Sequence, residues 1–250
     1  MQRINKIFSH RFPQIFTPIK SGCNSVALLL GIVYPLYAQE NKVITTEEIV
    51  MKAQRQEEQQ HTVLKDYTCF AKEVSRQIDK EQRITEETIT EKKVYQKKIK
   101  YREDVLKVVE KGESLSTEEI ARREKKERKE KRIEFSWGFP FAMREKYQFE
   151  LFSEEECEGR PCYLVKAIPK EKTEQLLDAK IWVDKEKFAQ IKMVGNPAKN
   201  PKYVKSMEIE IVNNEVAKDI WLPVLVKAKV KAAFLFMKKN IENLTTFSDY

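Results

Sequence analysis

The sequence predicts a mainly β fold of the α+β class, a meandering antiparallel half-barrel of nine to ten strands wrapped on an N-terminal helix. Three observations predict it. From Tyr67 onward, apolar residues recur with a period of two, which is typical of half-buried strands. In the second half, successive runs follow one another with no helix between them, which favours antiparallel pairing. A sheet this large with one apolar face must curl around something, because flat open sheets of many strands are unusual.

The first 38 residues form a segment of their own. They hold four basic residues and no acidic one, and they end in a 13-residue apolar run over 26–38. A membrane-spanning helix needs about 20 apolar residues, whereas the core of a signal peptide needs roughly 7 to 15. The pattern predicts a signal peptide over 1–38 and a mature chain over 39–250, with an uncleaved N-terminal anchor as the alternative.

The charge balance of the mature chain gives little reason to expect nucleic acid as a partner. The whole chain carries a formal charge of +8, but without the leader 43 basic residues stand against 39 acidic ones. The high isoelectric point is therefore largely a property of the leader.

A helix is predicted over 46–65, directly after the leader. Thr45 and Glu48 have the spacing of a capping box, and Ile49, Ala53 and Leu64 follow near helical spacing. The middle of this segment, 55–61, is strongly polar, so only a narrow stripe is expected to face a core.

Strands are predicted along the rest of the chain. The runs 67–78, 83–93 and 94–109 are rich in Lys and Glu, whereas 147–151, 203–211 and 224–236 alternate more sharply. A hairpin is expected where 181–183 leads through 184–187 into 188–194. In the last run, Lys227, Lys229 and Lys231 occupy the polar face, which leaves binding to anionic lipid head groups as a further hypothesis.

A charged helical insertion is predicted over 110–134. From 118 to 134, fourteen of seventeen residues are charged, with Ser116 or Thr117 as the candidate cap. This composition is typical of a solvated helix that is stabilised by ion pairs between residues i and i+4, each worth about 0.2 to 0.5 kcal/mol. An arm that docks a partner and a contact to anionic lipid stay open as alternatives.

Directly after the insertion, residues 135–143 place five large apolar side chains around Gly138 and Pro140. Such a stretch forms neither a regular strand nor a regular helix. Two roles are open for it, a plug in the core and a lid over a cavity.

Three cysteines follow the leader: Cys69, Cys157 and Cys162. Cys157 and Cys162 flank four residues, and a four-residue loop would set the two sulfurs opposite one another in a hairpin. The spacing predicts a disulfide between them. Pairing of Cys69 with either one, or three buried thiols, are the alternatives.

A catalytic role is not expected, because the sequence lacks the motifs of known catalytic sites. After the leader the chain has one histidine, His61, and it contains no zinc-protease, nucleophile-elbow or phosphate-loop motif. Metal binding lacks suitably spaced Cys and His ligands. The sequence therefore predicts no enzyme, no metal and no cofactor.

The second half resembles the periplasmic outer-membrane lipoprotein-sorting family, the LolA-like carriers. The resemblance is carried by the order of five segments: 146–151 (KYQFEL), 158–170 (EGRPCYLVKAIPK), 179–188 (AKIWVDKEKF), 220–223 (IWLP) and 246–250 (TFSDY). It implies an unclosed antiparallel β-barrel covered by helices, located in the periplasm, whose concave apolar interior holds acyl chains of lipoproteins or lipids. Each methylene removed from water gains about 0.8 kcal/mol.

Two functions are predicted from these observations. The first is a non-enzymatic periplasmic carrier or sensor, which touches the membrane only transiently. Its ligand-binding residues would be the lid residues Trp137, Phe139 and Phe141 and the strand residues Tyr147, Phe149, Leu151, Ile181, Val183, Met207, Ile209, Val226, Val230 and Phe234. Ordinary core packing against the first helix is the alternative for each of them. The second function is a structural or docking module with a filled barrel that binds an envelope protein through the charged helix 116–132.

Overall fold

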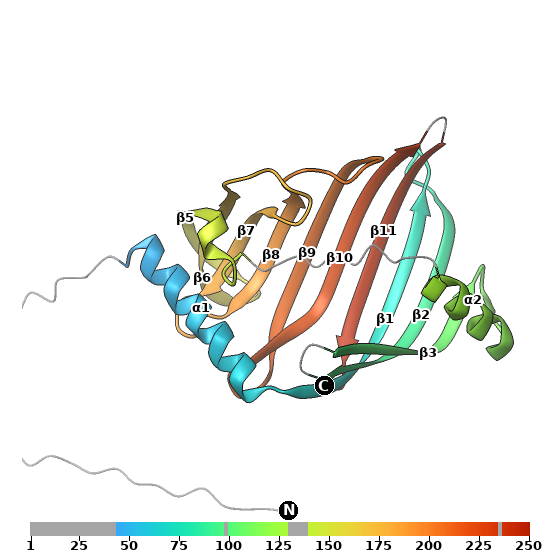
Figure 1. Cartoon of the computed structure of the whole chain (residues 1–250), viewed down its shortest axis with the longest axis horizontal. Coiled ribbons are helices and arrows are strands. Elements are labelled where there is room, and N and C mark those ends of the chain that lie inside the picture. The colour runs from blue at the N-terminus through green and yellow to red at the C-terminus, as the bar shows by residue number, and fades with distance from the viewer. Residues whose placement is uncertain (1–43, 98–99, 130–139, 235–236) are drawn as a thin grey trace, which may run out of the picture. The chain divides into compact units, whose positions relative to one another are not determined.

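The computed structural model describes residues 44–97, 100–129, 140–234 and 237–250. In these ranges the chain forms one antiparallel sheet of eleven strands in the order β4-β3-β2-β1-β11-β10-β9-β8-β7-β6-β5 (Figure 1). The elements are α1 (Thr46–Val63), β1 (Asp66–Ile78), β2 (Ile84–Lys97), β3 (Lys100–Glu110), β4 (Glu113–Ser114), α2 (Thr117–Lys129), the 3-10 helix η1 (Arg144–Lys146), β5 (Tyr147–Cys157), β6 (Arg160–Pro169), β7 (Leu177–Asp184), β8 (Gln190–Pro197), β9 (Val204–Ala217), β10 (Ile220–Phe234) and β11 (Met237–Ser248). The sheet is unclosed, with β4 and β5 at its edges, which confirms the predicted fold class.

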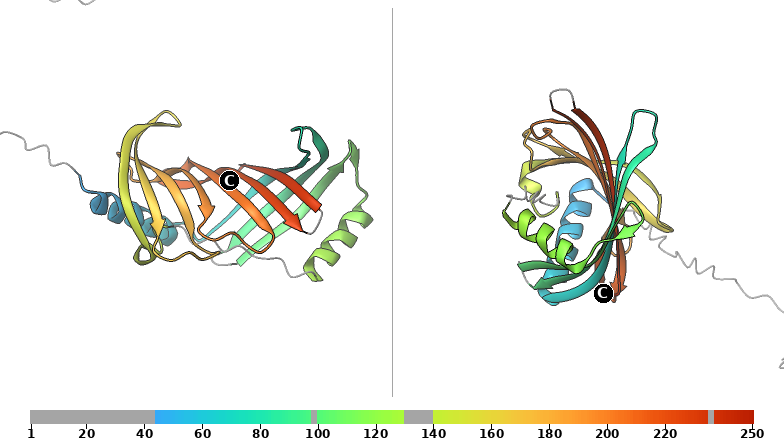
Figure 2. Two further views of the ribbon diagram at one scale, coloured as in Figure 1. Left: turned by 90° about the horizontal axis from the view of Figure 1, so that it is seen from above. Right: turned by 90° about the vertical axis from the view of Figure 1, so that its right-hand side faces the viewer.

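Helix α1 begins where the capping box predicts. The Thr45 hydroxyl accepts a hydrogen bond from the Glu48 amide at 3.2 Å, and the Glu48 carboxylate accepts one from the Thr45 amide at 3.0 Å. The helix buries Ile49, Val50 and Ala53 against the sheet. The sheet bends around it (Figure 2), so α1 fills one half of the concave face.

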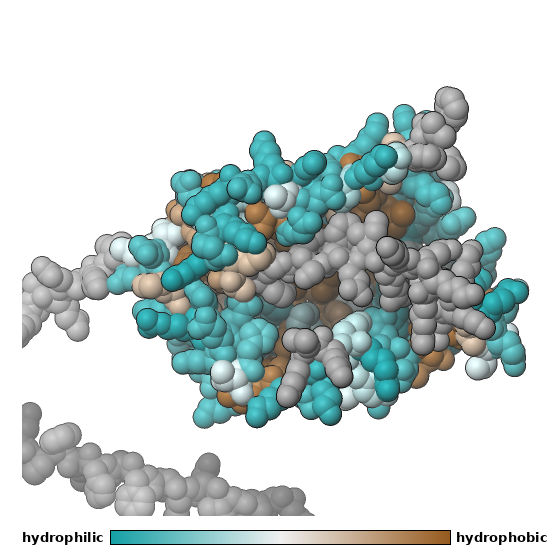
Figure 3. Space-filling view, in the orientation of Figure 1, coloured by the Kyte–Doolittle hydropathy of each residue, from teal (hydrophilic) through white to brown (hydrophobic). Residues whose placement is uncertain are grey.

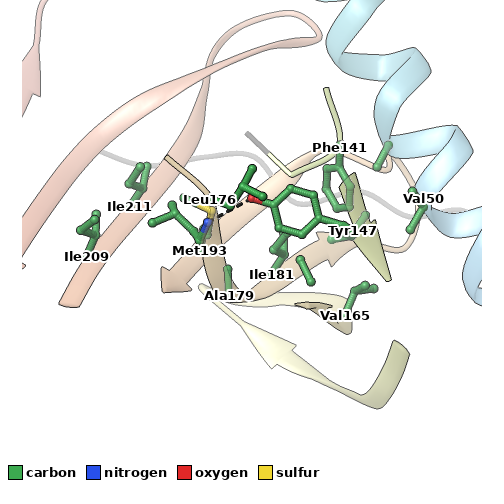
Figure 4. Close-up of a cluster of buried hydrophobic side chains, with 14 of the residues drawn as sticks. Val50, Phe141, Tyr147, Val165, Leu176, Ala179, Ile181, Met193, Ile209 and Ile211 are labelled. Atoms are coloured by element: carbon green, nitrogen blue, oxygen red, sulfur yellow. Dashed lines mark hydrogen bonds between the residues drawn. The ribbon is translucent and has the colours of Figure 1, made fainter. Parts of the chain in front are cut away.

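The main core lies between α1 and the strands β5 to β9. Its buried members are Ile49, Val50, Ala53, Phe141, Tyr147, Val165, Ala167, Leu176, Leu177, Ala179, Ile181, Val183, Met193, Met207, Ile209 and Ile211. Figure 4 shows these side chains as one cluster next to α1. The Tyr147 hydroxyl accepts a hydrogen bond from the Leu177 amide at 3.0 Å, so the one polar group of that ring is satisfied inside the cluster.

The other half of the concave face, on β11, β1, β2 and β3, is more polar. Lys92 lies between two carboxylates, at 2.6 Å from Glu73 and 3.3 Å from Glu103. Burial works to lower the pKa of Lys92, but the two carboxylates outweigh it and raise the pKa above its ordinary value. Apart from a small buried cluster of Cys69, Ala71 and Val94, these strands therefore place charged groups where the strands of the main core place aliphatic ones.

The turn after β2 and the presence of β11 differ from the prediction. The expected break between Lys93 and Val94 is wrong, because β2 continues to Lys97 and pairs Val94 with both Cys69 and Glu103. Charged residues on both faces of this run hid the position of the turn. Strand β11 was not indicated, since its Lys, Asn, Glu and Thr residues carry little apolar alternation.

The hairpin between β5 and β6 corrects the disulfide prediction. Its turn has only two residues, Glu158 and Gly159, both with positive φ, as type I′ turns require. Cys157 therefore lies opposite Arg160, and Cys162 opposite Glu155, so the cysteines are diagonal neighbours. Both are buried free thiols, as is Cys69. Burial raises the pKa of Cys162 to about 12, which keeps this thiol protonated and unreactive.

The edge strand β5 is irregular and acidic. Its pairing with β6 shifts between Leu151 and Ser153, which forms a bulge at Phe152. The three residues 154–156 that follow are all glutamates. At the opposite edge, β4 is only two residues long.

Helix α2 follows β4 within the predicted insertion. Ser116 is its cap, because its hydroxyl accepts a hydrogen bond from the Glu119 amide at 3.3 Å. Arg123 forms a two-pronged ion pair with Glu110 of β3, and this pair holds the first turns of α2 against the sheet. In the ranges that the structure describes, no helix is long and apolar enough to cross a membrane.

The row of lysines on β10 is interleaved with carboxylates. In the register, Lys227 lies next to Glu210, Lys229 lies next to Glu208, and the Lys229 ammonium is 3.6 Å from Glu242. A face with this balance gives little net attraction for anionic head groups.

Candidate functional site

A hollow of about 900 Å³ lies between the C-terminal half of α1 and the sheet. Its lining comes from α1 and the residues just after it, the start of β1, the end of β2, the starts of β8 and β10, one residue of β9, and Phe141. The lining residues are Ala53, Gln56, Glu57, Gln60, His61, Thr62, Leu64, Lys65, Tyr67, Gln96, Phe141, Gln190, Asn213, Trp221, Leu222 and Pro223. In the space-filling view, apolar side chains are visible within the hollowed part of this face and polar ones surround it (Figure 3).

Gln60 holds α1 over this hollow. Its side-chain amide donates to the Trp221 carbonyl at 2.9 Å and its carbonyl accepts from the Trp221 amide at 2.7 Å. The side chain thus pairs with the backbone at the start of β10 as a neighbouring strand would. This two-point contact fixes the helix at a distance from the sheet that leaves the space beneath it open.

The hollow changes character along its length. Ala53, Phe141, Trp221 and Leu222 are buried and form an apolar inner part. His61, Thr62 and Lys65 are exposed and mark the end that opens to solvent. Such a site suits a molecule with an apolar body and a polar end.

Glu57 is the ionisable group of the inner wall. Burial raises the pKa of its carboxyl, and His61 only partly offsets this rise. A carboxyl whose charged form is disfavoured in a cavity is a candidate functional group.

We expect Glu57→Gln to raise the melting temperature at neutral pH. Because the pKa of Glu57 is raised on folding, the native state binds a proton more readily than the unfolded state, and stability is lost as pH rises through the raised pKa. Gln removes this loss, so the two melting temperatures should converge as pH falls below the ordinary value of 4.5. Thermal melts from acidic to neutral pH measure the effect. Glu47→Gln is the control, because Glu47 is exposed on the same helix and does not contribute to the raised pKa of Glu57. Identical curves for Glu57→Gln and the wild type would contradict the interpretation.

A second hollow of about 610 Å³ lies at the start of β1 and the end of β2. The two share Tyr67 and Gln96. The remaining lining residues of the second hollow are Asp66, Thr68, Tyr95, Lys97, Tyr101 and Arg102. The Tyr67 ring is 5.7 Å from that of Tyr250, so the last residue of the chain packs beside this second hollow.

The residues predicted to bind a ligand are found mostly in the packed core. Tyr147, Ile181, Val183, Met207 and Ile209 are buried there, and Phe149, Leu151, Val226 and Val230 pack against its margin. Phe141 belongs to the core and also lines the first hollow. Trp137 and Phe139 lie outside the described residues, as does the side chain of Phe234.

The sequence interpretation missed the part of the lining that α1 supplies. Gln56, Glu57 and Gln60 fall in the polar stretch that was expected to face water. The spacing of 53, 56, 57, 60 and 64 places them on one helical face with Ala53 and Leu64, and this was the signal available in the sequence.

In the part of the chain that the structure describes, no group of three or more His, Cys, Asp or Glu residues is arranged to hold a metal ion.

Comparisons with known proteins give similarities of fold. Residues 142–232 match a family model whose description reads "Uncharacterized protein". No curated protein matches the chain. Among solved structures, an outer membrane lipoprotein-sorting protein domain from Vibrio parahaemolyticus is 11% identical, with a TM-score of 0.39 over 82% of this chain and 92% of that one. A DUF1329 family protein from Desulfovibrio piger is 13% identical, with a TM-score of 0.39 over 83% and 92%.

A LolA superfamily protein from Nitrosomonas europaea is 10% identical, with a TM-score of 0.37 over 83% of this chain and 93% of that one. The architecture that the sequence resemblance implied, an unclosed antiparallel sheet wrapped on a helix, is the architecture of this chain.

Proposed function

We propose that this chain is a non-enzymatic periplasmic binding protein, a carrier or sensor, that shields an acyl chain of a lipid or lipoprotein beneath α1. The observation that carries the proposal is the hollow of about 900 Å³ with its buried apolar inner part. Its size lies in the range of roughly 300 to 1,000 Å³ that is usual for small-molecule sites.

The energetics favour an acyl chain as the guest. Transfer of each methylene out of water is worth about 0.8 kcal/mol, so a long chain gains affinity from length alone and needs few specific contacts. Trp221 and Leu222 supply the apolar floor, and the Gln60 contact to Trp221 keeps α1 in place above it. Val226 and Val230, half-buried on the same face of β10, would extend the apolar surface along the strand.

The leader supports a location outside the cytoplasm. Its start is basic, and its 13-residue apolar run has the length of the core of an export signal. The predicted signal peptide 1–38 lies outside the described residues, so this part of the proposal rests on the sequence.

A substitution that fills the hollow tests the proposal. In Gln56→Trp the indole would occupy the space beneath α1, because Gln56 lines the hollow and makes no contact that holds the helix. We expect its affinity for a fluorescent fatty acid to fall about tenfold or more, since even part of the chain's methylenes would lose their site. Fluorescence titration measures it, with thermal melts alongside.

Gln59→Trp is the matched control, because Gln59 is exposed on the same helix outside the lining. Its affinity should equal that of the wild type. Equal affinities of Gln56→Trp and the wild type would show that the acyl chain does not bind in the hollow beneath α1. A wild-type protein that binds no acyl compound would favour the alternative, a filled scaffold that docks a partner through α2.

A further inference from the structure

The hollow beneath α1 has a closed end, and this end lies where the main core begins. Among the described residues, Ala53 and Phe141 are the two that line the hollow and also belong to the core cluster. Both are 2% exposed, so the side chains around them are closely packed. At the other end of the lining, Lys65 lies just after α1 and is exposed. A guest that enters from the side of Lys65 therefore meets the packed core at Phe141.

The ring of Phe141 closes this end, and two other rings support it from behind. Its centre lies 5.8 Å from that of Phe149, with an angle of 30° between the two planes, and the Phe149 ring lies 5.9 Å from that of Tyr147. The Tyr147 hydroxyl accepts a hydrogen bond from the Leu177 amide at 3.0 Å, which fixes the ring at the back of this stack. Figure 4 shows Phe141 at the side of the cluster that faces α1. Phe141 thus forms a supported wall between the hollow and the core.

The depth of the hollow is set by the fold. Helix α1 forms one long wall, and from Ala53 to its last residue, Val63, it rises about 15 Å. Before Ala53, the buried side chain of Ile49 holds the helix in the core, and near its other end Gln60 holds it to Trp221. A wall that is held at both ends does not move aside to make room for a longer guest. The hollow therefore offers an acyl chain a limited length.

We propose that Phe141 sets the longest acyl chain that the hollow accepts. This inference rests on the proposed function, because it assumes that an acyl chain lies beneath α1. Each methylene that enters the hollow leaves water, which is worth about fourfold in affinity. A methylene beyond the length that fits either stays in water or displaces a packed ring, so it adds no affinity. Phe141 is therefore a specificity-determining residue, and the ligand class is acyl chains up to a defined length.

The test measures affinity as a function of acyl-chain length. Fatty acids of even chain length, from octanoate to octadecanoate, are used to displace a fluorescent fatty acid from the mature chain, residues 39–250. For the wild type, we expect affinity to rise about fifteenfold with each two added methylenes up to a limiting length and then to level off. In Phe141→Ala the limiting length should increase by about two methylenes or more, because the neighbouring side chains close only part of the space that a truncated side chain leaves. The readout is the limiting length, which a loss of stability alone does not change.

Ala53→Leu tests the same end of the hollow in the opposite direction, because it adds carbon atoms there. Its limiting length should decrease by about two methylenes, and this variant decides the question if Phe141→Ala does not fold. Phe188→Ala is the matched control, because the Phe188 ring packs against the margin of the same core but lies outside the hollow. Its limiting length should equal that of the wild type.

The outcomes separate this inference from the proposed function. An affinity that rises along the whole series in the wild type would overturn the length proposal and leave the acyl-chain site intact. The same conclusion would follow from an unchanged limiting length in a folded variant at Phe141 or Ala53, or from an equal change in Phe188→Ala. Binding of no fatty acid to the wild type would overturn the proposed function itself.

Discussion

Ile181→Ala is expected to destabilise the fold by about 2 to 5 kcal/mol, as truncation of a fully buried aliphatic side chain typically does. Ile181 has no exposed surface and lies on β7 in the middle of the cluster around Tyr147. The two neighbouring strands pair it with Val165 and Met193, so the surrounding chain can close only part of the cavity. Urea denaturation followed by circular dichroism measures the free energy of unfolding.

Ile84→Ala is the control for this change, because Ile84 is 53% exposed at the start of β2 and should lose little stability. The same experiment separates core packing from ligand binding. If Ile181 only packs the core, acyl affinity measured well below the melting temperature should stay at the wild-type value. A stable Ile181→Ala protein with weakened acyl binding would show instead that β7 lines the ligand site.

Asp184→Ala is expected to cost about 3 kcal/mol, because it leaves two backbone amides of a tight turn without an acceptor. Asp184 is 1% exposed. One carboxylate oxygen accepts from the amides of Glu186 and Lys187 at 2.9 and 2.6 Å, and the other pairs with Arg160 at 3.1 Å. The carboxylate therefore ties the β7–β8 turn to the start of β6. Equilibrium unfolding in urea gives the difference.

Two variants divide this cost between the turn and the ion pair. Asp184→Asn keeps an oxygen for the amides of Glu186 and Lys187, so it should lose less than Asp184→Ala. Arg160→Ala leaves both backbone contacts in place and removes the ion-pair partner of Asp184, a longer ion pair with Glu215 and the cation over the Trp221 ring. A loss for Arg160→Ala as large as that for Asp184→Ala would assign the stability to the ion pair.

The structural features that depend on residues close together in the sequence were predictable from it. The capping box at Thr45 and Glu48 set the start of α1, and period-two alternation located most of the strands. The sheet was predicted for the same reason, since successive strands with short connections have few ways to pair. The length of the turn between Cys157 and Cys162 depends on the positive φ of Glu158 and Gly159. The spacing of the two cysteines in the sequence carries no information about these angles.

The site was less predictable because alternation identifies a face of the sheet without showing what covers it. Ile181 and Leu222 are both buried, yet the first is inside the cluster around Tyr147 and the second lines the hollow. The difference is set by Gln60, whose contact to Trp221 joins segments 161 residues apart. Polar residues of a helix usually face solvent, so the polarity of Gln56 and Glu57 outweighed the spacing that places them on the face of Ala53 and Leu64.

The irregular edges of the sheet protect the protein against aggregation at high concentration. An open sheet exposes amide and carbonyl groups that another chain could extend into a fibril. Here one border is a two-residue strand, and the other is kinked at Phe152 and followed by three consecutive glutamates. Two such borders would meet with misaligned hydrogen bonds and mutual repulsion, so the fold can stay unclosed and still resist polymerisation.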